Sequence, residues 1–301
     1  MFRRVLLPLG GATDAQHVVR WGASLAEPFL AELILLRVLD STSPDDAAAE
    51  SFLSGIASTI SDRRFNVRTI VSRGSISEEI LRVAKEENVD LIVLATKSRL
   101  GVKTSMLNSV TNSVLHTAKN PIVVLHVDGQ IKPETHLPKT VLVPLYGAKN
   151  SESVVDFAVD FAEKSGALLV FVKATNPAFR GISTWGPIPS KGSRSSLHIR
   201  DFAKEYLDRY VEKAKSKGVS AIAQTPTGST SACIAALANE LSETLIVISS
   251  RDLGGLKRTV IGSTTDKVVW GTSQSVLVIP YGYMDNKYDV LSQQVNAVQQ
   301  Q

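Results

Sequence analysis

The chain has 301 residues, enough for two domains of ordinary size, each with its own apolar core. Its composition, 44% hydrophobic and 21% charged with 19 glycines and 12 prolines, is that of a folded globular protein and excludes collagen, coiled coil and bulk disorder. The net charge of +4 is spread along the chain, which argues against nucleic-acid binding. The single cysteine, Cys233, allows no internal disulfide, so a cytoplasmic protein is expected.

Short apolar runs, many of them rich in β-branched residues, alternate along the chain with segments of helical periodicity. The runs predict strands at residues 3–9, 32–39, 66–72, 90–95, 121–127, 139–145, 167–174, 219–225, 244–249 and 275–280. Between them, apolar residues at helical spacing predict one-sided helices that contain Phe157 and Leu207. No apolar run reaches the roughly 18 residues of a membrane-spanning helix, so no membrane span is expected.

The sequence repeats itself, which defines two copies of one pattern. Residues 5–12, VLLPLGGA, return at 141–148 as VLVPLYGA, and the pair Gly74-Ser75 returns as Gly228-Ser229. Residues 176–200 have no counterpart in the first copy and are rich in turn residues. They therefore predict a long loop inserted into the second copy.

Continuous apolar strands separated by helices are typical of a parallel sheet that is covered on both faces through right-handed crossovers. We therefore predict an α/β fold of two tandem, doubly wound parallel-sheet domains. The expected domains span residues 1–128 and 139–282, joined by a linker at 129–138. The second contains the insert at 176–200, and a polar, Gln-rich tail follows at 283–301.

The carboxyl ends of the strands are the expected ligand sites of such sheets, at the point where the strand order reverses. In both copies the fourth strand is followed by small residues, a basic loop and a pair of residues that begins a helix. In the second copy Gly262 tolerates a left-handed backbone, and Ser263 is expected to cap the helix. Asn108 and Ser109 take these places in the first copy. The free N–H groups of such a helix favour a phosphate, but an ordinary capped helix beside a basic turn explains the residues equally well.

Both halves resemble universal stress protein domains, and the whole chain is similar to the tandem two-domain members of that family. Nucleotide-binding members carry Gly-x2-Gly-x9-Gly-Ser/Thr after the fourth strand, and this spacing is kept in both copies. The second copy has Ser249 and Asp252 ahead of Gly262-Ser263, and the first has Ala95 and Ser98 ahead of Asn108-Ser109. The family's Asp at the end of the first strand is replaced by Gly10 and Tyr146. The resemblance implies a Rossmann-like fold of the adenine nucleotide alpha hydrolase-like type.

The resemblance also implies a site for a nucleotide or another phosphate-bearing ligand in each copy. The candidate residues are Gly10, Val38, Ala95, Ser98, Asn108, Ser109, Tyr146, Ala174, Ser249, Asp252, Gly262, Ser263 and Thr264. The implied ligand is ATP or AMP, with Mg²⁺, and the implied role is that of a non-catalytic regulatory module in the stress response.

The alternative function is a ligand-free scaffold for protein interactions, with degenerate nucleotide sites. The carboxylate of Asp252 would repel a triphosphate, and the ring of Tyr146 would fill space that adenosine occupies. An ATPase or phosphotransferase is a more distant alternative, because no general base or pair of metal-binding carboxylates can be placed in the site. The histidines lack the spacing of a metal site, so no metal is expected.

The last strand of each copy is short and apolar, and such edge strands pair across domains in the family. The two halves are therefore expected to form a pseudo-twofold pair within one chain, which dimerises again as a homodimer. Trp185 lies in the insert, and we hypothesise that the insert folds over the second-copy cleft or presents a surface to a regulatory protein partner. Trp21 and Trp270 fall in helices and are expected to serve packing.

Overall fold

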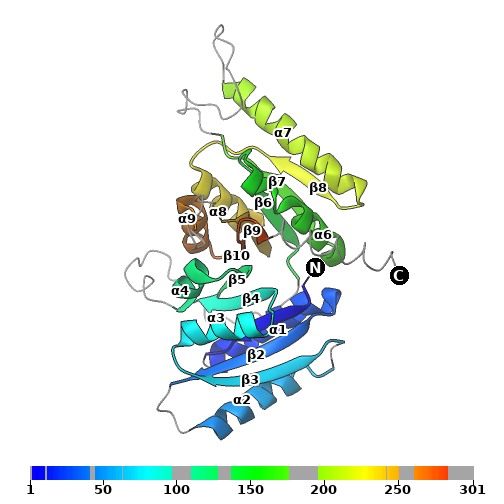
Figure 1. Cartoon of the computed structure of the whole chain (residues 1–301). Helices are drawn as coiled ribbons and strands as arrows, with labels where there is room; N and C mark the ends of the chain where they lie inside the picture. The colour runs from blue at the N-terminus through cyan, green and yellow to red at the C-terminus, as the bar shows by residue number, and fades with distance from the viewer. Residues whose placement is uncertain are drawn as a thin grey trace, which may run out of the picture.

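The computed structural model describes residues 2–10, 12–40, 45–62, 64–96, 110–127, 137–175, 196–241, 243–250 and 261–283. Their strands form one sheet of ten, in the order β3-β2-β1-β4-β5-β10-β9-β6-β7-β8 (Figure 1). The strands are β1 (Arg4–Pro8), β2 (Glu32–Leu39), β3 (Val67–Arg73), β4 (Leu91–Thr96), β5 (Ile122–His126), β6 (Thr140–Pro144), β7 (Leu168–Val172), β8 (Ala221–Gln224), β9 (Thr244–Ser249) and β10 (Ser275–Ile279). Each strand expected from the sequence is confirmed, and each end agrees within two residues.

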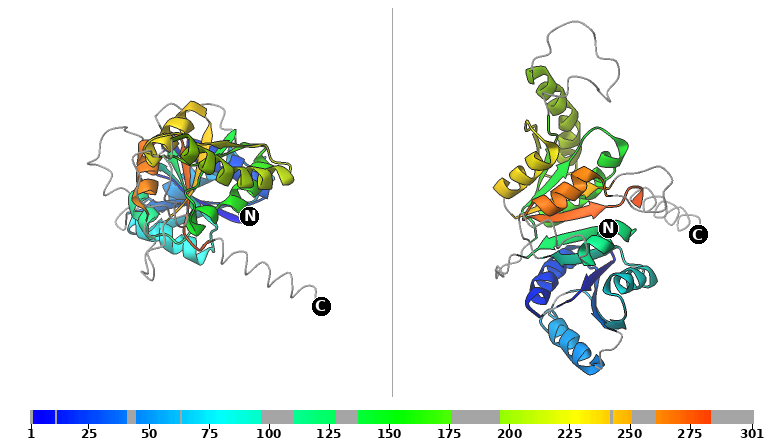
Figure 2. Two further views of the ribbon diagram at one scale, coloured as in Figure 1. Left: turned by 90° about the horizontal axis from the view of Figure 1, so that it is seen from above. Right: turned by 90° about the vertical axis from the view of Figure 1, so that its left-hand side faces the viewer.

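The pairing of the strands reproduces the predicted fold class. Within each copy all neighbouring strands are parallel, and the order reverses between β1 and β4 and again between β6 and β9. The two copies meet where β10 pairs with β5 in the antiparallel direction, with Val276 opposite Val124. These two strands lie side by side at the middle of the molecule (Figure 2). The last strands of the copies therefore pair as the sequence led us to expect.

Helices cover both faces of the sheet. They are α1 (Ala12–Ala26), the 3-10 turn η1 (Glu27–Phe29), α2 (Asp46–Ser58), α3 (Ile76–Glu86), α4 (Val110–Thr117), α5 (Lys149–Glu152), α6 (Val155–Ser165), α7 (Ser196–Ser216), α8 (Thr230–Leu241) and α9 (Ser263–Gly271). Buried residues of α1, α2, α6 and α7 share one core with the sheet, and those of α3, α4, α8 and α9 share a second core on the other face. Every described helix is too short or too polar to span a bilayer.

The helix α6 illustrates how the sequence pattern produces this packing. Its apolar residues from Val155 to Ala162 recur at helical spacing, and all of them are buried. The helix ends at Gly166, which adopts the left-handed conformation (φ 70°) that favours glycine after a last helical turn. The predicted helix around Leu207 is likewise confirmed, as the buried face of α7.

The insert differs in part from its prediction. Residues 196–200 were expected in a loop, but they form the first turns of α7. The remainder of the insert, including Trp185, lies outside the described residues. The exact domain boundaries stay a prediction.

Aromatic rings join the two copies on the α1/α6 face of the sheet. Phe2 lies 5.3 Å from Phe157 of α6 between ring centroids, and Phe29 lies 5.8 Å from Phe161. Phe2, Phe157 and Phe161 are buried in one continuous core, and the partly buried Phe29 packs against it. Further along the contact, the hydroxyl of Tyr283 donates a hydrogen bond to the carbonyl of Asp90 (3.2 Å). The copies are therefore packed together as well as paired through their strands.

A charged cluster fixes α3 against the end of β3 in the first copy. The Glu79 carboxylate accepts a hydrogen bond from the Ser72 hydroxyl and a 2.7 Å ion pair from Arg82. Gly74 (φ 137°) makes the turn between strand and helix, and a side chain there would meet Glu79. The hydrogen bonds from Arg82 and then Ser72 hold the pKa of Glu79 below its ordinary value of 4.5, against an opposing effect of burial.

We expect Glu79→Gln to lower the melting temperature at pH 7 by about 1–3 °C, because a partly exposed ion pair contributes little. A carboxylate with a lowered folded-state pKa stabilises the fold above its unfolded pKa of 4.5, and this contribution is lost as the pH falls through the folded value. The difference between the variant and wild type should therefore shrink below pH 4.5 in thermal melts at several pH values. A constant difference down to pH 2 would contradict this account.

Candidate functional site

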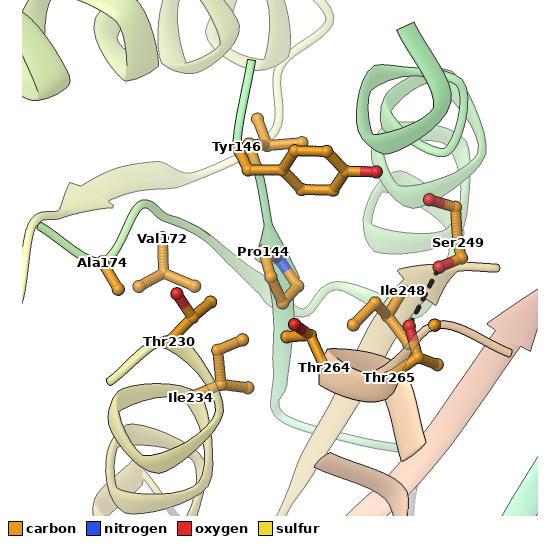
Figure 3. A pocket seen from close by; sticks show the side chains of 12 residues that line it. Pro144, Tyr146, Val172, Ala174, Thr230, Ile234, Ile248, Ser249, Thr264 and Thr265 are labelled. Atoms are coloured by element: carbon orange, nitrogen blue, oxygen red, sulfur yellow. Dashed lines mark hydrogen bonds between the residues drawn. The ribbon is translucent and has the colours of Figure 1, made fainter. Parts of the chain in front are cut away.

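A pocket of about 210 Å³ opens at the carboxyl ends of β6, β7 and β9 in the second copy (Figure 3). It lies at the reversal of strand order between β6 and β9, where parallel sheets of this class bind ligands. Its walls are completed by the starts of α8 and α9. The lining residues are Pro144, Leu145, Tyr146, Val172, Ala174, Thr230, Ile234, Ile248, Ser249, Gly262, Thr264 and Thr265.

The pocket brings together five of the residues chosen from the sequence: Tyr146, Ala174, Ser249, Gly262 and Thr264. Ser263 is exposed at the start of α9 and does not line it. The first-copy candidates Gly10, Val38 and Ala95 lie at the corresponding edge of the other half of the sheet. The candidates Ser98, Asn108, Ser109 and Asp252 lie outside the described residues, as do the basic loops that contain them.

Sequence reasoning did not select the other lining residues, Pro144, Leu145, Val172, Thr230, Ile234, Ile248 and Thr265. Most of them are apolar strand or helix residues that any core would contain. Thr230 could have been found, because it directly follows the repeated Gly228-Ser229 pair that leads into α8 at this edge. Thr265 could have been found because the first copy keeps a threonine, Thr111, in the same place.

The start of α9 differs from its prediction in the residue that forms the N-cap. Gly262 is itself the N-cap and has an extended backbone (φ −65°, ψ 150°), not a left-handed one. Ser263 was expected to cap the helix, but it is the first helical residue, and no side chain caps this end. The extended backbone of Gly262 is the ordinary conformation of an N-cap residue, so this position does not use the left-handed conformation that glycine tolerates. The first N–H groups of α9 still lack partners within the helix, as at any helix start.

Thr265 and Ser249 connect this helix to the sheet. The Thr265 hydroxyl donates a hydrogen bond to the carbonyl of Ser249 (3.2 Å), and in the first copy the Thr111 hydroxyl makes the equivalent bond to Ala95 (3.4 Å). The Ser249 side chain is only 7% exposed, and its hydroxyl has no hydrogen-bond partner within the described part of the chain. A buried hydroxyl without a partner is costly, and Ser249 is the lining residue whose side-chain hydrogen bonding the described part of the chain leaves incomplete.

Tyr146 forms the rim of the pocket rather than its interior. Its side chain is 44% exposed, and the hydroxyl of Ser249 points towards its ring (Figure 3). The loop that carries it is fixed, because the Tyr146 N–H donates to the Ser151 hydroxyl (3.3 Å), which donates to the carbonyl of Ala148 (2.8 Å). The pocket extends beside this ring, and the expectation that the ring fills space that adenosine occupies stays a prediction.

Charged side chains lie behind the pocket rather than in its described walls. Lys173 sits between two lining residues, and its Nζ lies 5.2 Å from the ring centroid of Tyr206 on the α7 face. Burial lowers the pKa of Lys173, partly offset by the charge of Glu152. The Tyr206 hydroxyl donates to Glu152 (2.8 Å), and burial chiefly raises the pKa of Tyr206. The described lining thus consists of apolar groups and hydroxyls, and the described residues contain no cluster of three metal-ligating side chains.

The sequence profile of the universal stress protein family matches this chain at residues 1–126 and again at residues 138–280. This chain belongs to the universal stress protein family. It is a tandem member, because the profile matches each half separately. The family assignment carries with it a general role in the stress response.

Individual relatives agree with this assignment. A universal stress protein of Methanocaldococcus jannaschii is 30% identical over 77 residues, which cover 26% of this chain and 48% of that protein. One of Mycobacterium tuberculosis is 23% identical over 218 residues, covering 72% of this chain and 70% of the relative. The solved structure of a universal stress protein from Archaeoglobus fulgidus superposes with a TM-score of 0.68 at 21% identity, covering 93% of this chain and 97% of that one. This structural likeness supports the fold.

Proposed function

We propose that this universal stress protein binds a nucleotide or another phosphate-bearing ligand in the second-copy pocket, and that it acts as a non-catalytic regulatory module. The observation that carries the proposal is the buried Ser249 hydroxyl without a partner among the described residues, in a pocket at the reversal of strand order. A ligand that accepts or donates a hydrogen bond there removes the cost of that buried group.

The phosphate is proposed to lie at the start of α9, at Gly262, Ser263 and Thr264. The unpaired N–H groups of the first helical turn and the positive end of the helix dipole both favour an anion. ATP and AMP, with Mg²⁺, are the proposed nucleotides. Because the described walls hold no general base, no catalytic step is assigned to the pocket.

The second candidate function is a scaffold that binds proteins rather than nucleotides. It is favoured by Tyr146 and Gly10, which occupy the two places where the family's nucleotide-binding members have an acidic residue. A homodimer, a regulatory protein partner and a cytoplasmic location are proposals that belong to either candidate.

The test is native mass spectrometry of the purified chain, followed by calorimetric titration with ATP and AMP, with and without Mg²⁺. We expect bound nucleotide or micromolar affinity in wild type, and at least about 30-fold weaker binding in Gly262→Asp. An aspartate is a favourable N-cap, so the helix is retained, while its carboxylate repels the phosphate.

Gly271→Asp is the matched control, because it adds the same charge at the far end of the same helix, where a side chain meets open space. It should bind like wild type. A wild-type chain that carries no nucleotide and does not respond to millimolar ATP or AMP would overturn nucleotide binding and favour the scaffold.

A further inference from the structure

The two ends of the ten-stranded sheet differ in their charge. β8 forms one end and β3 forms the other (Figure 1), and the strand registers of the two copies align β8 with β3. Residues 64–85, which contain β3 and most of α3, include Arg64, Arg68, Arg73, Glu78, Glu79, Arg82 and Lys85. The aligned residues 218–239 of the second copy contain no Asp, Glu, Lys, Arg or His.

At the β3 end, an ion-pair cluster covers the outer strands. Arg68 of β3 pairs with Glu32 of β2 (2.9 Å) and with Glu87 after α3 (2.6 Å). The repeat and the strand registers place an apolar residue at each of these positions in the second copy. In the order Arg68, Glu32 and Glu87, the replacements are Ile222, Leu168 and Leu241. We call these three apolar side chains, together with the outer edge of β8, the β8 surface.

The chain itself covers the β8 surface only in part. Ile222 lies on the same face of the sheet as Val170, its neighbour in β7, and this is the face that α8 covers. In the first copy α3 packs on β2 and β3, whereas in the second copy α8 packs on β6 and β9, further from the sheet edge. Ile222 is therefore 40% exposed, and Leu168 and Leu241 are partly buried.

The backbone of β8 offers hydrogen bonds at the same edge. The carbonyl of Gln224 accepts a hydrogen bond from the N–H of Lys173, which follows β7 (3.0 Å). The backbone groups of successive residues in a strand point to opposite sides, so those of Ala221 and Ala223 point away from β7. A strand edge with outward backbone groups and no charged side chain is a template for pairing with another strand.

The charge pattern favours a second copy of this chain as the partner. A twofold interface places the same surface of two subunits together, so like charges on that surface repel. The uncharged residues 218–239 avoid this repulsion, and they offer a charged peptide or a nucleic acid no ion pair. The molecule already uses such a contact internally, because β5 and β10 join the two copies as antiparallel apolar strands.

We infer that the β8 surface is the contact of a homodimer, in which β8 pairs antiparallel with β8 of the partner subunit. With the twofold axis at Ile222, Ala221 exchanges hydrogen bonds with Ala223 of the partner subunit, and the two Ile222 side chains lie directly opposite each other. The inference specifies the contact of the proposed homodimer, and it does not depend on a ligand in the second-copy pocket.

The experiment is analytical ultracentrifugation of the full chain over a range of concentrations. Wild type should sediment as a dimer that dissociates on dilution. Ile222→Arg installs the first-copy residue and should weaken dimerisation at least about 10-fold, because two guanidinium groups then face each other. Ala223→Pro should weaken it similarly, because it removes an N–H that points to the partner. Circular dichroism should show the wild-type content of helix and strand in both variants.

Leu30→Arg is the matched control, since Leu30 is an apolar residue that is 68% exposed after η1 in the first copy, away from β8. It should dimerise like wild type. Cysteine cross-linking then tests the register in a Cys233→Ser background. Ile222→Cys should form a covalent dimer on oxidation, because directly opposite Cα atoms lie about 4.5 Å apart. Gln224→Cys should not, because the two cysteines would lie about 14 Å apart.

Two results would overturn the inference. A wild-type chain that stays monomeric at every concentration would remove both the proposed homodimer and this contact. A dimer that withstands Ile222→Arg and Ala223→Pro would join through another surface, so the homodimer would stand and the β8 contact would fail. Neither result bears on nucleotide binding, which the calorimetric titrations measure separately.

Discussion

Replacing Phe157 by alanine should destabilise the chain by about 3–5 kcal/mol, the usual cost of removing a buried phenylalanine ring. The Phe157 side chain is 2% exposed, and its ring lies 5.3 Å from Phe2 of the other copy and 6.1 Å from Phe161. The substitution therefore leaves a cavity where the two copies pack together.

This loss can be measured by chemical denaturation followed by tryptophan fluorescence, in backgrounds that keep either Trp21 or Trp270 as the single tryptophan, one in a helix of each copy. Both fluorescence transitions should shift to lower denaturant concentration, because the removed ring belongs to a core that both copies share. Phe202→Ala is the control, since Phe202 is 66% exposed on α7 and its loss should change stability by less than about 0.5 kcal/mol. A Phe157→Ala effect below about 1 kcal/mol would contradict the bridging role of this ring.

Replacing Gly22 by valine should destabilise the chain by about 3 kcal/mol, at the upper end of the usual cost of overpacking. A Cβ atom at this position in α1 would lie 2.7 Å from one terminal carbon of Leu7 and 2.8 Å from the other. Leu7 is fully buried in β1, so its side chain cannot move away without disturbing the core. Glycine at this place lets the helix approach the sheet closely.

Gly55→Val is the matched control, because Gly55 lies inside α2 and a side chain there meets open space. Valine has a somewhat higher helix propensity than glycine, so this variant should be neutral or slightly stabilised. The two variants are compared by their denaturation midpoints. Equal midpoints would mean that α1 does not need close contact with β1.

The strands could be predicted because each is a short apolar run, and a parallel sheet buried on both faces requires such runs. The second-copy pocket was found only in part, since its lining is assembled from segments that are far apart in the sequence. Ser249 and Gly262 could be predicted because they flank one loop of the sequence. Thr230 and Pro144 reach the same pocket from α8 and from the end of β6. Their approach depends on how the helices pack on the sheet, which a local pattern does not contain.

The errors of the sequence reasoning have local causes. Residues 196–200 follow a stretch rich in turn residues. Because of this composition they were assigned to the loop, although they begin α7. At Gly262 the glycine tolerates a left-handed backbone, but the N-cap that it forms is extended, and glycine is also accepted there. A glycine beside a helix start therefore has two explanations, and only the backbone angles separate them.

The antiparallel pairing of β5 with β10 has a consequence for how the two copies can change. If two identical subunits joined through this strand, both would be products of one gene, and every substitution in one subunit would appear in the other. Joined in one polypeptide, the halves meet at a high effective concentration, and each is encoded separately. A substitution at the second-copy pocket then leaves the corresponding edge of the first copy unchanged, and the reverse also holds. The tandem arrangement thus lets the two halves of one repeated fold evolve independently.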